Sequence, residues 1–319
     1  MPNVLIIGGS GYIGLALGKS LLQAGTHTVW GTARTPEKAK LLRSNEIISV
    51  EQDVTNTFTL SAFILDNSIN IVVDTSSAYE AASSILYGVI DAAMTRQTAL
   101  EKEKIASPKL GFVYTSGAWI YGSQKTRIND LAPVDSLHSQ AKPATPVTWR
   151  PAHEQAILAA RDMLDVAILR PHTIYGRGSW IWGTWWGPLA EAAKSGSTSP
   201  VQVPGARAAC PGTVHIDDVA AGFHAAIDRI DGRLGSWPVF DLLTETIPLV
   251  AIIETVKTVL GVEAPLEYIG TQGDPLLEAL SLVSKSDASR AKTVLGWNPK
   301  RTEFLLNLPI YLRAWEASQ

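Results

Sequence analysis

The stretch GGSGYIG at residues 8–14 follows an apolar run and opens a helix-period segment that begins at Ile13. Glycines at three-residue spacing permit a tight turn, and they let backbone amide groups approach a pyrophosphate at a helix N-terminus. Because the turn follows the first predicted strand directly, it predicts a dinucleotide site. The residues expected to form this part of the site are Gly8, Ser10, Gly11, Tyr12, Ile13 and Gly14.

Apolar runs alternate with helix-period stretches along the first half of the chain. The predicted strands lie at residues 3–9, 27–33, 47–53, 69–75, 110–116 and 166–172, and the helix-period stretches include 13–24, 36–43 and 76–93. This alternation predicts an α/β fold with a doubly wound parallel sheet and a ligand crevice at the carboxyl ends of its strands. We expect a dinucleotide-binding domain over residues 1–175 and a small C-terminal substrate lobe over 176–319. A strand near 238–243 is expected to return to the sheet domain.

Composition narrows the class of protein. The 319 residues are 46% hydrophobic, and the net charge of −3 provides no basic surface for nucleic acid or anionic membranes. Cys210 is the single cysteine, which excludes an internal disulfide and fits a reducing compartment. No apolar run approaches membrane-spanning length. We therefore expect a cytoplasmic protein that binds neither nucleic acid nor membranes.

The end of the second predicted strand bears on the choice of cofactor. An NAD-preferring site normally has an acidic residue there for the ribose hydroxyls, whereas this chain has Arg34, followed by Lys38 and Lys40. A guanidinium can hold a 2′-phosphate bidentately, so Arg34 and Lys38 favour NADP(H). The alternative is that they form a solvated basic start of a helix. Asp53, at the end of the third strand, is placed to hydrogen-bond the adenine ring.

Several further motifs resemble those of extended short-chain dehydrogenase/reductases, the group of NAD-dependent epimerases and dehydratases. They are GGSGYIG (8–14), QDV (52–54), YTSGAWIYG (114–122), LRPHTIYGRG (169–178), VHIDDVAAG (214–222) and VLGWNP (294–299). The resemblance covers almost the whole chain and implies a Rossmann-type sheet with a dinucleotide across its C-terminal edge. It also implies that Thr75 and Ser76 line the cofactor, that Pro171 lies near the nicotinamide, and that the C-terminal lobe covers a substrate pocket.

The chain departs from this family at the residues that carry its chemistry, a Ser or Thr and a Tyr-x-x-x-Lys pair. The usual serine position falls on Gly117, one residue after Ser116, so the Ser116 side chain is expected to point away from that position. In the preferred alignment of VTWRPAHEQAIL (147–158), Arg150 takes the lysine position and Pro146 the tyrosine position. In the alternative alignment, Trp149 takes the tyrosine position and His153 takes the lysine position. Neither contains a tyrosine.

Other residues remain candidates for catalysis. Tyr121 and Lys125 form the one Tyr-x-x-x-Lys spacing in the chain, but they lie in a loop, and coincidence is the favoured interpretation. His153 is interpreted equally as a general acid or as a solvated histidine. His172 is expected near the nicotinamide, with a structural role as the alternative, and Arg150 is expected to clamp the cofactor. No spacing of histidines or cysteines suggests a metal site.

The segment SWIWGTWWGPL (179–189) is rich in tryptophan and begins the predicted lobe. Its position favours an apolar or aromatic substrate, with a packed lobe or a homodimer contact as alternatives. The tryptophans expected to bind substrate are Trp119, Trp149, Trp180, Trp182 and Trp185.

Together these features predict an NADP(H)-dependent oxidoreductase acting on an apolar small molecule. A redox-neutral isomerase, epimerase, dehydratase or cyclase is the first alternative. A non-enzymatic dinucleotide sensor is the second.

Overall fold

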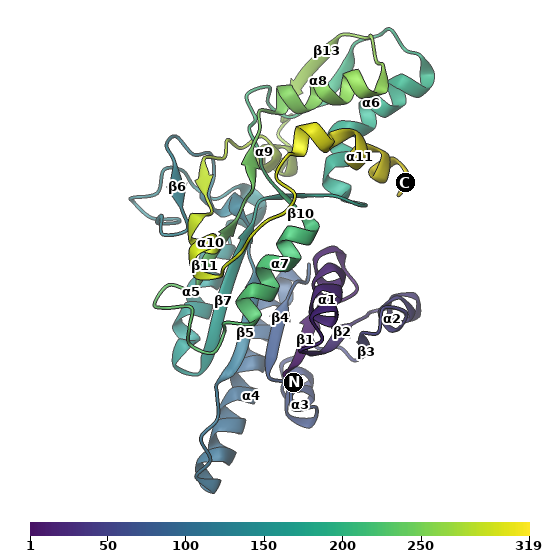
Figure 1. Ribbon diagram of the computed structural model, residues 1–319. Coiled ribbons are helices and arrows are strands. Elements are labelled where there is room, and N and C mark those ends of the chain that lie inside the picture. The colour runs from purple at the N-terminus through teal and green to yellow at the C-terminus, as the bar shows by residue number, and fades with distance from the viewer.

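A seven-stranded sheet forms the centre of the computed structural model, which describes all residues 1–319 (Figure 1). From one edge to the other its strands are β11 (Val239–Leu242), β7 (Leu164–Pro171), β5 (Leu110–Thr115), β4 (Ile71–Asp74), β1 (Asn3–Ile7), β2 (Thr28–Thr32) and β3 (Ile48–Val50). Every neighbouring pair is parallel. The chain runs from β1 to one edge and then returns to β4, so the strand order reverses between these two strands. This confirms the predicted doubly wound α/β fold and places its ligand crevice beside β1 and β4.

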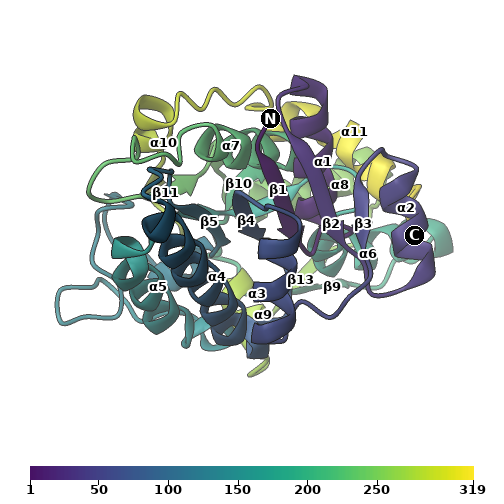
Figure 2. The same ribbon diagram turned by 90° about the horizontal axis from the view of Figure 1, so that it is seen from below.

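Helices cover both faces of the sheet (Figure 2). One face carries α1 (Tyr12–Ala24), α2 (Pro36–Arg43), α7 (Ile216–Ile227) and α10 (Ser289–Val294), and the other carries α3 (Thr57–Asp66), α4 (Ala82–Glu103) and α5 (Arg150–Ala159). Side chains of β1 alternate between the two cores: Val4 and Ile6 pack on the first face, and Leu5 and Ile7 on the second. No helix combines the length and the apolarity needed to cross a membrane.

The structure contains all six predicted strands and places the seventh, β11, at one edge of the sheet. It corrects the helix expected at 76–93, because α4 begins only at Ala82 and continues to Glu103. The Ser76 amide donates to Oδ1 of Asp74 at 2.9 Å, and the Ala78 amide donates to Oγ of Ser76 at 3.3 Å. Such local side-chain bonds compete with helix formation, so this segment forms a loop with a short 3₁₀ turn, η1 (Tyr79–Ala81).

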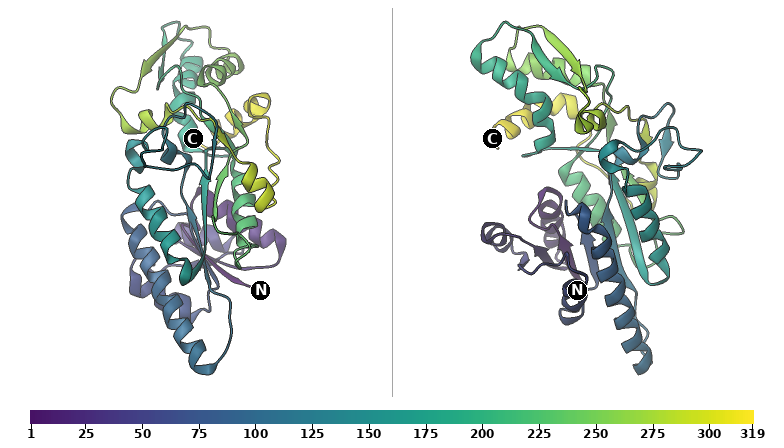
Figure 3. Two further views of the ribbon diagram at one scale, coloured as in Figure 1. Left: turned by 90° about the vertical axis from the view of Figure 1, so that its left-hand side faces the viewer. Right: turned by 180° about the vertical axis from the view of Figure 1, so that it is seen from behind.

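The C-terminal lobe lies beyond the carboxyl ends of the sheet strands (Figure 3). It contains α6 (Gly183–Ser195), α8 (Leu249–Leu260), α9 (Pro275–Leu280), α11 (Phe304–Glu316) and the parallel pair β9 (Val201–Pro204) and β13 (Leu266–Gly270). Two small sheets connect it to the main body: β12 (Glu245–Thr246), β10 (Gly212–His215) and β8 (Thr173–Tyr175), and β14 (Ser286–Asp287) with β6 (Ile128–Asn129). The division into domains at residue 175 stays a prediction.

Candidate active site

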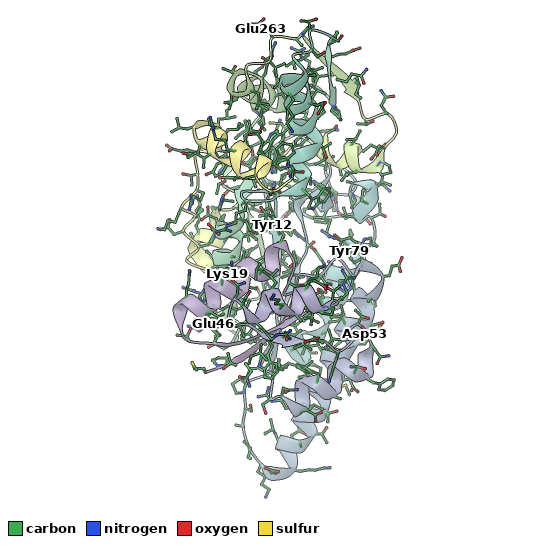
Figure 4. The ribbon with its side chains drawn as sticks, turned by 90° about the vertical axis from the view of Figure 1, so that its right-hand side faces the viewer. Tyr12, Lys19, Glu46, Asp53, Tyr79 and Glu263 are labelled. Atoms are coloured by element: carbon green, nitrogen blue, oxygen red, sulfur yellow. The ribbon has the colours of Figure 1, made fainter.

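A cavity of about 760 Å³ lies where the sheet strands end and the lobe begins. Its walls come from the turn after β1, the ends of β2 and β3, the loop after β4, the segment after β5, the start of α5 and the residues that follow β7. In Figure 4, Tyr12 and Tyr79 lie close to the lobe, and Asp53 lies farther from it. All three of these residues line the cavity.

The glycine turn is shaped by close backbone contacts. Gly8 has a φ of 80°, and a Cβ there would lie 2.9 Å from the backbone of Ser76. A Cβ on Gly14 would lie 2.3 Å from the carbonyl oxygen of Gly8, so only glycine fits at either position. At the start of α1 the amides of Tyr12 and Ile13 have no backbone acceptor. Free amides at the N-terminus of a helix form an anion site, and Ser10, Gly11, Tyr12 and Ile13 all line the cavity.

Two cations lie at the end of the cavity beside β2. Arg34 and Lys38 line the cavity, are exposed, and make no ion pair. Their neighbour Arg43 is bound to Glu51 at 2.7 Å. Asp53 faces the same space and accepts hydrogen bonds from the amide and the hydroxyl of Thr55, which lower the pKa of its carboxyl group. This end therefore offers two unpaired cations and the ionised carboxylate of Asp53, whereas Glu51, which also lines it, is bound to Arg43.

Polar side chains line the cavity wall between β4 and β7. Thr75 and Ser76 line it after β4, and Pro171 lines it at the end of β7. Ser116 also lines it, and the direction of its side chain relative to the usual serine position stays a prediction. The hydroxyl groups of Ser116 and Thr115 are both buried, and neither has a hydrogen-bond partner within the protein. Each is a buried polar group that the protein itself leaves without a hydrogen bond, which is rare in a folded protein.

Arg150 enters the cavity at the first residue of α5. A Cβ on Gly117 would lie only 2.9 Å from Nη1 of Arg150, so the missing side chain at 117 makes room for the guanidinium group. That group lies over the ring of Tyr79, 5.3 Å from its centroid, and 5.6 Å from the centroid of Trp149. Its buried Nε has no partner. Arg150 therefore presents a fixed positive charge at the position that Gly117 leaves open.

Tyr79 was not among the residues predicted for the site. It lies in η1, is about half exposed and lines the cavity. Its place after the carboxyl end of β4, beside the predicted crevice, was the signal available in the sequence.

Tyr121, a candidate for catalysis in the sequence, does not line the cavity. Its hydroxyl donates to Asp241 at 2.9 Å and accepts from Nη1 of Arg170 at 2.6 Å. Arg170 also forms a two-pronged ion pair with Glu154 of α5. All four side chains are nearly inaccessible to solvent, and burial raises the pKa of Asp241 to about 7. The network joins α5 to the sheet and is a structural one.

Two residues of α5 and its approach also lie outside the cavity lining. His153 is buried, which excludes the interpretation as a solvated histidine. Its ring packs against Tyr114 and Trp149, at centroid distances of 4.9 and 5.8 Å, and burial lowers its pKa. Trp149 packs against Tyr79, which does line the cavity. Both predictions of direct contact with a ligand are corrected, because these rings fill the space behind the cavity wall.

His172 lines the main cavity, as predicted, and also a small adjoining one of about 30 Å³. Its Nδ1 lies 3.3 Å from the hydroxyl of Ser284, and its Nε2 is buried without a partner. Burial lowers the pKa of His172 to about 3. The ring is therefore neutral near pH 7, where it can share a hydrogen bond with a ligand but carries no extra proton to donate.

The tryptophans divide between the cavity and the lobe core. Trp119 and Trp180 line the cavity, as predicted. Trp182 and Trp185 are fully buried, packed against each other with ring centroids 5.4 Å apart, which corrects their predicted role in binding substrate. Their indole nitrogens donate to the carbonyl oxygens of Ile174 and Pro204. They stabilise the lobe because each large aromatic ring buries a large apolar area in its core.

The fold resembles that of several solved enzymes. A UDP-glucose 4-epimerase from Thermotoga maritima, solved with UDP-glucose, is 17% identical with a TM-score of 0.73, over 99% of each chain. A dTDP-glucose 4,6-dehydratase from Bacillus anthracis, solved with NAD, is 18% identical with a TM-score of 0.69, over 100% of this chain and 98% of that one. A UDP-glucose 4-epimerase from Bifidobacterium longum, solved with NAD⁺ and UDP, is 18% identical with a TM-score of 0.69, over 99% and 98%. Structural similarity at these low sequence identities establishes the fold alone.

No curated protein sequence matches the chain. The sequence model of the NAD dependent epimerase/dehydratase family matches residues 4–236, which is most of the chain and includes the glycine turn, Arg150 and the end of β7. The chain therefore belongs to the NAD dependent epimerase/dehydratase family.

Proposed function

We propose that the protein is an NADP(H)-dependent oxidoreductase that acts on a small, largely apolar carbonyl compound or the matching alcohol. The observation that carries this proposal is the pair of unpaired cations, Arg34 and Lys38, on the cavity wall beside the end of β2. No carboxylate follows β2 to accept from ribose hydroxyls, whereas a guanidinium and an ammonium group together suit a 2′-phosphate.

The residues present fit a dinucleotide. The turn at Gly8 and Gly14 leaves no room for side chains, and the free amides at the start of α1 suit a pyrophosphate. Asp53 lies at the adenine end of the proposed site, and Pro171 with the unpaired hydroxyl of Ser116 lies at the nicotinamide end. When bound, the nicotinamide would supply or accept a hydride.

Three of the five predicted catalytic residues line the cavity: Ser116, Arg150 and His172. We assign Arg150 the role of binding and orienting the cofactor, because a guanidinium group stays charged and cannot carry a proton to the substrate. Reduction of a carbonyl takes two electrons with the hydride and one proton from another donor. The Ser116 hydroxyl and solvent reaching the cavity are the donors we propose, in place of a Tyr-x-x-x-Lys pair.

Apolar side chains line the part of the cavity beside the lobe: Trp119, Ile174, Trp180 and Ile181. The polar residues His172, Thr173 and Ser179 line the same part, and Arg150 is the one cation there. Arg177, at the start of the lobe, is paired with Asp217 at 2.5 Å and does not line the cavity. A diphosphate-linked sugar would need further cations, so the lining supports a smaller apolar substrate.

A redox-neutral isomerisation or dehydration is the second candidate. The family and the names of the three solved enzymes favour it, because all three are epimerases or dehydratases and two were solved with NAD or NAD⁺. Such a reaction restores the cofactor in each cycle. Turnover of a substrate with a trace of NADP⁺, and no net change in nicotinamide absorbance, would identify it. Oxidation of NADPH in proportion to product would support the reductase.

Calorimetric titration tests the proposed cofactor. NADPH should bind at least tenfold more tightly than NADH, about 1.4 kcal/mol, and Arg34→Ala should remove most of that difference while NADH binding persists. Lys40→Ala is the matched control, because Lys40 is exposed on α2, the helix that follows Arg34, and does not line the cavity. Equal affinities in the parent protein would overturn the assignment.

The role of Arg150 is tested in the same assay. Arg150→Ala should weaken NADPH binding by about 1.5–3 kcal/mol through loss of a charged hydrogen bond, and Arg150→Lys should recover part of it. Gln155→Ala, an exposed change on the same helix, should have no effect. Unchanged affinity in Arg150→Ala would show that this side chain does not hold the cofactor.

A further inference from the structure

A cluster of two histidines and one carboxylate lies outside the cavity, on the face of the sheet that carries α1 and α7. His27 directly precedes β2, His224 lies in the last turn of α7, and Asp228 is the first residue after that helix. None of the three lines either cavity. The family assignment gives this cluster no role, and its ligands come from distant parts of the chain.

The three side chains converge on one point. Nε2 of His27 lies 3.6 Å from Oδ1 of Asp228, and Nε2 of His224 lies 3.6 Å from Oδ2. The three potential ligand atoms all lie within 4.8 Å of one another. A tetrahedral zinc ion with bonds of about 2.0–2.1 Å holds its ligand atoms about 3.3–3.4 Å apart. Small rotations of the side chains would therefore close the cluster around an ion.

Both imidazole rings are oriented from behind by hydroxyl groups. Nδ1 of His27 lies 3.0 Å from Oγ1 of Thr26, and Nδ1 of His224 lies 2.9 Å from Oγ of Ser20 on α1. If each Nδ1 donates to its hydroxyl, each Nε2 keeps a free lone pair directed at the shared space. Metal-binding histidines characteristically have such a partner on the second nitrogen.

The surroundings favour a cation at this point. His27 is only 7% exposed, and the carboxylate of Asp228 faces its ring. The last carbonyl groups of α7 give that end of the helix a partial negative charge. Asp228 is about half exposed, so an ion and a water ligand can reach the cluster from solvent.

We propose that His27, His224 and Asp228 bind one divalent transition-metal ion, preferentially zinc, with water completing the tetrahedron. The ion would join the turn before β2 to the end of α7, and so fix α7 against α1. Because the cluster opens into neither cavity, the role is structural and independent of the proposed reaction.

The test uses untagged, full-length protein stripped of metal with a chelator and then dialysed. Calorimetry with ZnCl₂ should show one equivalent bound, with a rise in thermal midpoint. CoCl₂ should give the strong visible absorption of a four-coordinate site, without the sulfur-to-metal band that Cys210 would produce. Asp228→Asn, His27→Ala and His224→Ala should each lower affinity more than 100-fold, and Ser20→Ala about 10–100-fold through loss of ring orientation.

His138→Ala is the matched control, because His138 is exposed and outside the cluster. It should bind zinc as the parent does. Because Asp228 is about half exposed, the Asp228→Asn variant should fold, and it keeps the test valid if a histidine variant does not. Absence of stoichiometric zinc binding in the parent protein would overturn the proposal, leaving the cluster as an ion pair. Zinc binding that persists in Asp228→Asn and His224→Ala would do the same, by locating the metal elsewhere.

Discussion

Removing the carboxylate of Glu154 should destabilise the protein strongly while leaving the cofactor site intact. Glu154 and Arg170 are each only 2% exposed, and both oxygens of the carboxylate accept from the guanidinium. Glu154→Ala would leave a buried positive charge without its main partner. Because a guanidinium stays charged in proteins, the cost cannot be avoided by releasing a proton.

The structure narrows the expected magnitude. Loss of one partner from a buried ion pair typically costs about 3–5 kcal/mol. Arg170 retains its hydrogen bond to Tyr121, and Asp241 lies on the far side of that tyrosine. The charge of Glu154 also helps to raise the pKa of Asp241, so its removal favours ionised Asp241, which compensates part of the loss. We therefore expect the low end of the range, about 3 kcal/mol.

Urea unfolding followed by circular dichroism measures this loss. Glu154→Gln keeps the shape and one acceptor, so it should cost less than the alanine variant. Gln155→Ala is exposed on the same helix and should change the free energy of unfolding by less than about 0.5 kcal/mol. NADPH affinity of the folded Glu154→Ala variant should stay near that of the parent, because Glu154 does not line the cavity.

A loss below about 1 kcal/mol in Glu154→Ala would refute this reasoning, because it would mean that the pair is solvated or already compensated. Loss of cofactor binding with little loss of stability would be equally damaging. It would place Glu154 in the site and not in the framework behind it.

Three further outcomes are expected. Tyr121→Phe should cost about 1–3 kcal/mol in urea unfolding, because it leaves Arg170 short of a partner, while NADPH affinity is unchanged; normal stability with lost turnover would contradict this. Burial lowers the pKa of His172 from its ordinary 6.5 to about 3, so the unfolded state binds the proton first in acid, and stability should fall by up to about 1.4 kcal/mol per pH unit as the pH drops below 6.5. His172→Asn should show a shallower loss in unfolding curves from pH 7 to 4, and an identical slope would exclude the histidine as its source. Trp182→Ala should lower the free energy of unfolding by about 3–5 kcal/mol. Trp180→Ala, at an exposed position on the cavity wall, should mainly reduce the fluorescence quenching caused by a bound apolar ligand. The reverse pattern in thermal melting and quenching would contradict the assignment of Trp182 to the lobe core.

The sheet, the glycine turn and the basic end of the cavity could all be predicted from the amino-acid sequence. These features depend on short-range patterns: the apolar strand of β1, the crowded turn from Gly8 to Gly14, and the absence of an acid where Arg34 stands. A turn in which a Cβ would strike the backbone is specified by residues within one segment, so it can be recognised without the rest of the chain.

Which polar residues line the cavity could not be predicted from the sequence and depends on how the elements pack. On α5, Ala152 and Ala156 are exposed, and the buried side carries His153 and Glu154. Helical periodicity favours burying the apolar side of a helix, but the charge of Arg170 on β7 requires a carboxylate opposite it. That requirement arises only when the helix and the strand meet.

Longer-range contacts set the remaining assignments. A hydrogen bond to Asp241 holds Tyr121 outside the cavity, and Arg150 fills the space over Gly117. His27 lies beside His224 only because α7 packs beside α1. Each of these pairs is distant in sequence, and no local pattern records its partner. Whether a polar side chain serves a ligand or the framework depends on the hydrogen-bond partners that folding brings to it, because a buried polar group left unpaired is costly.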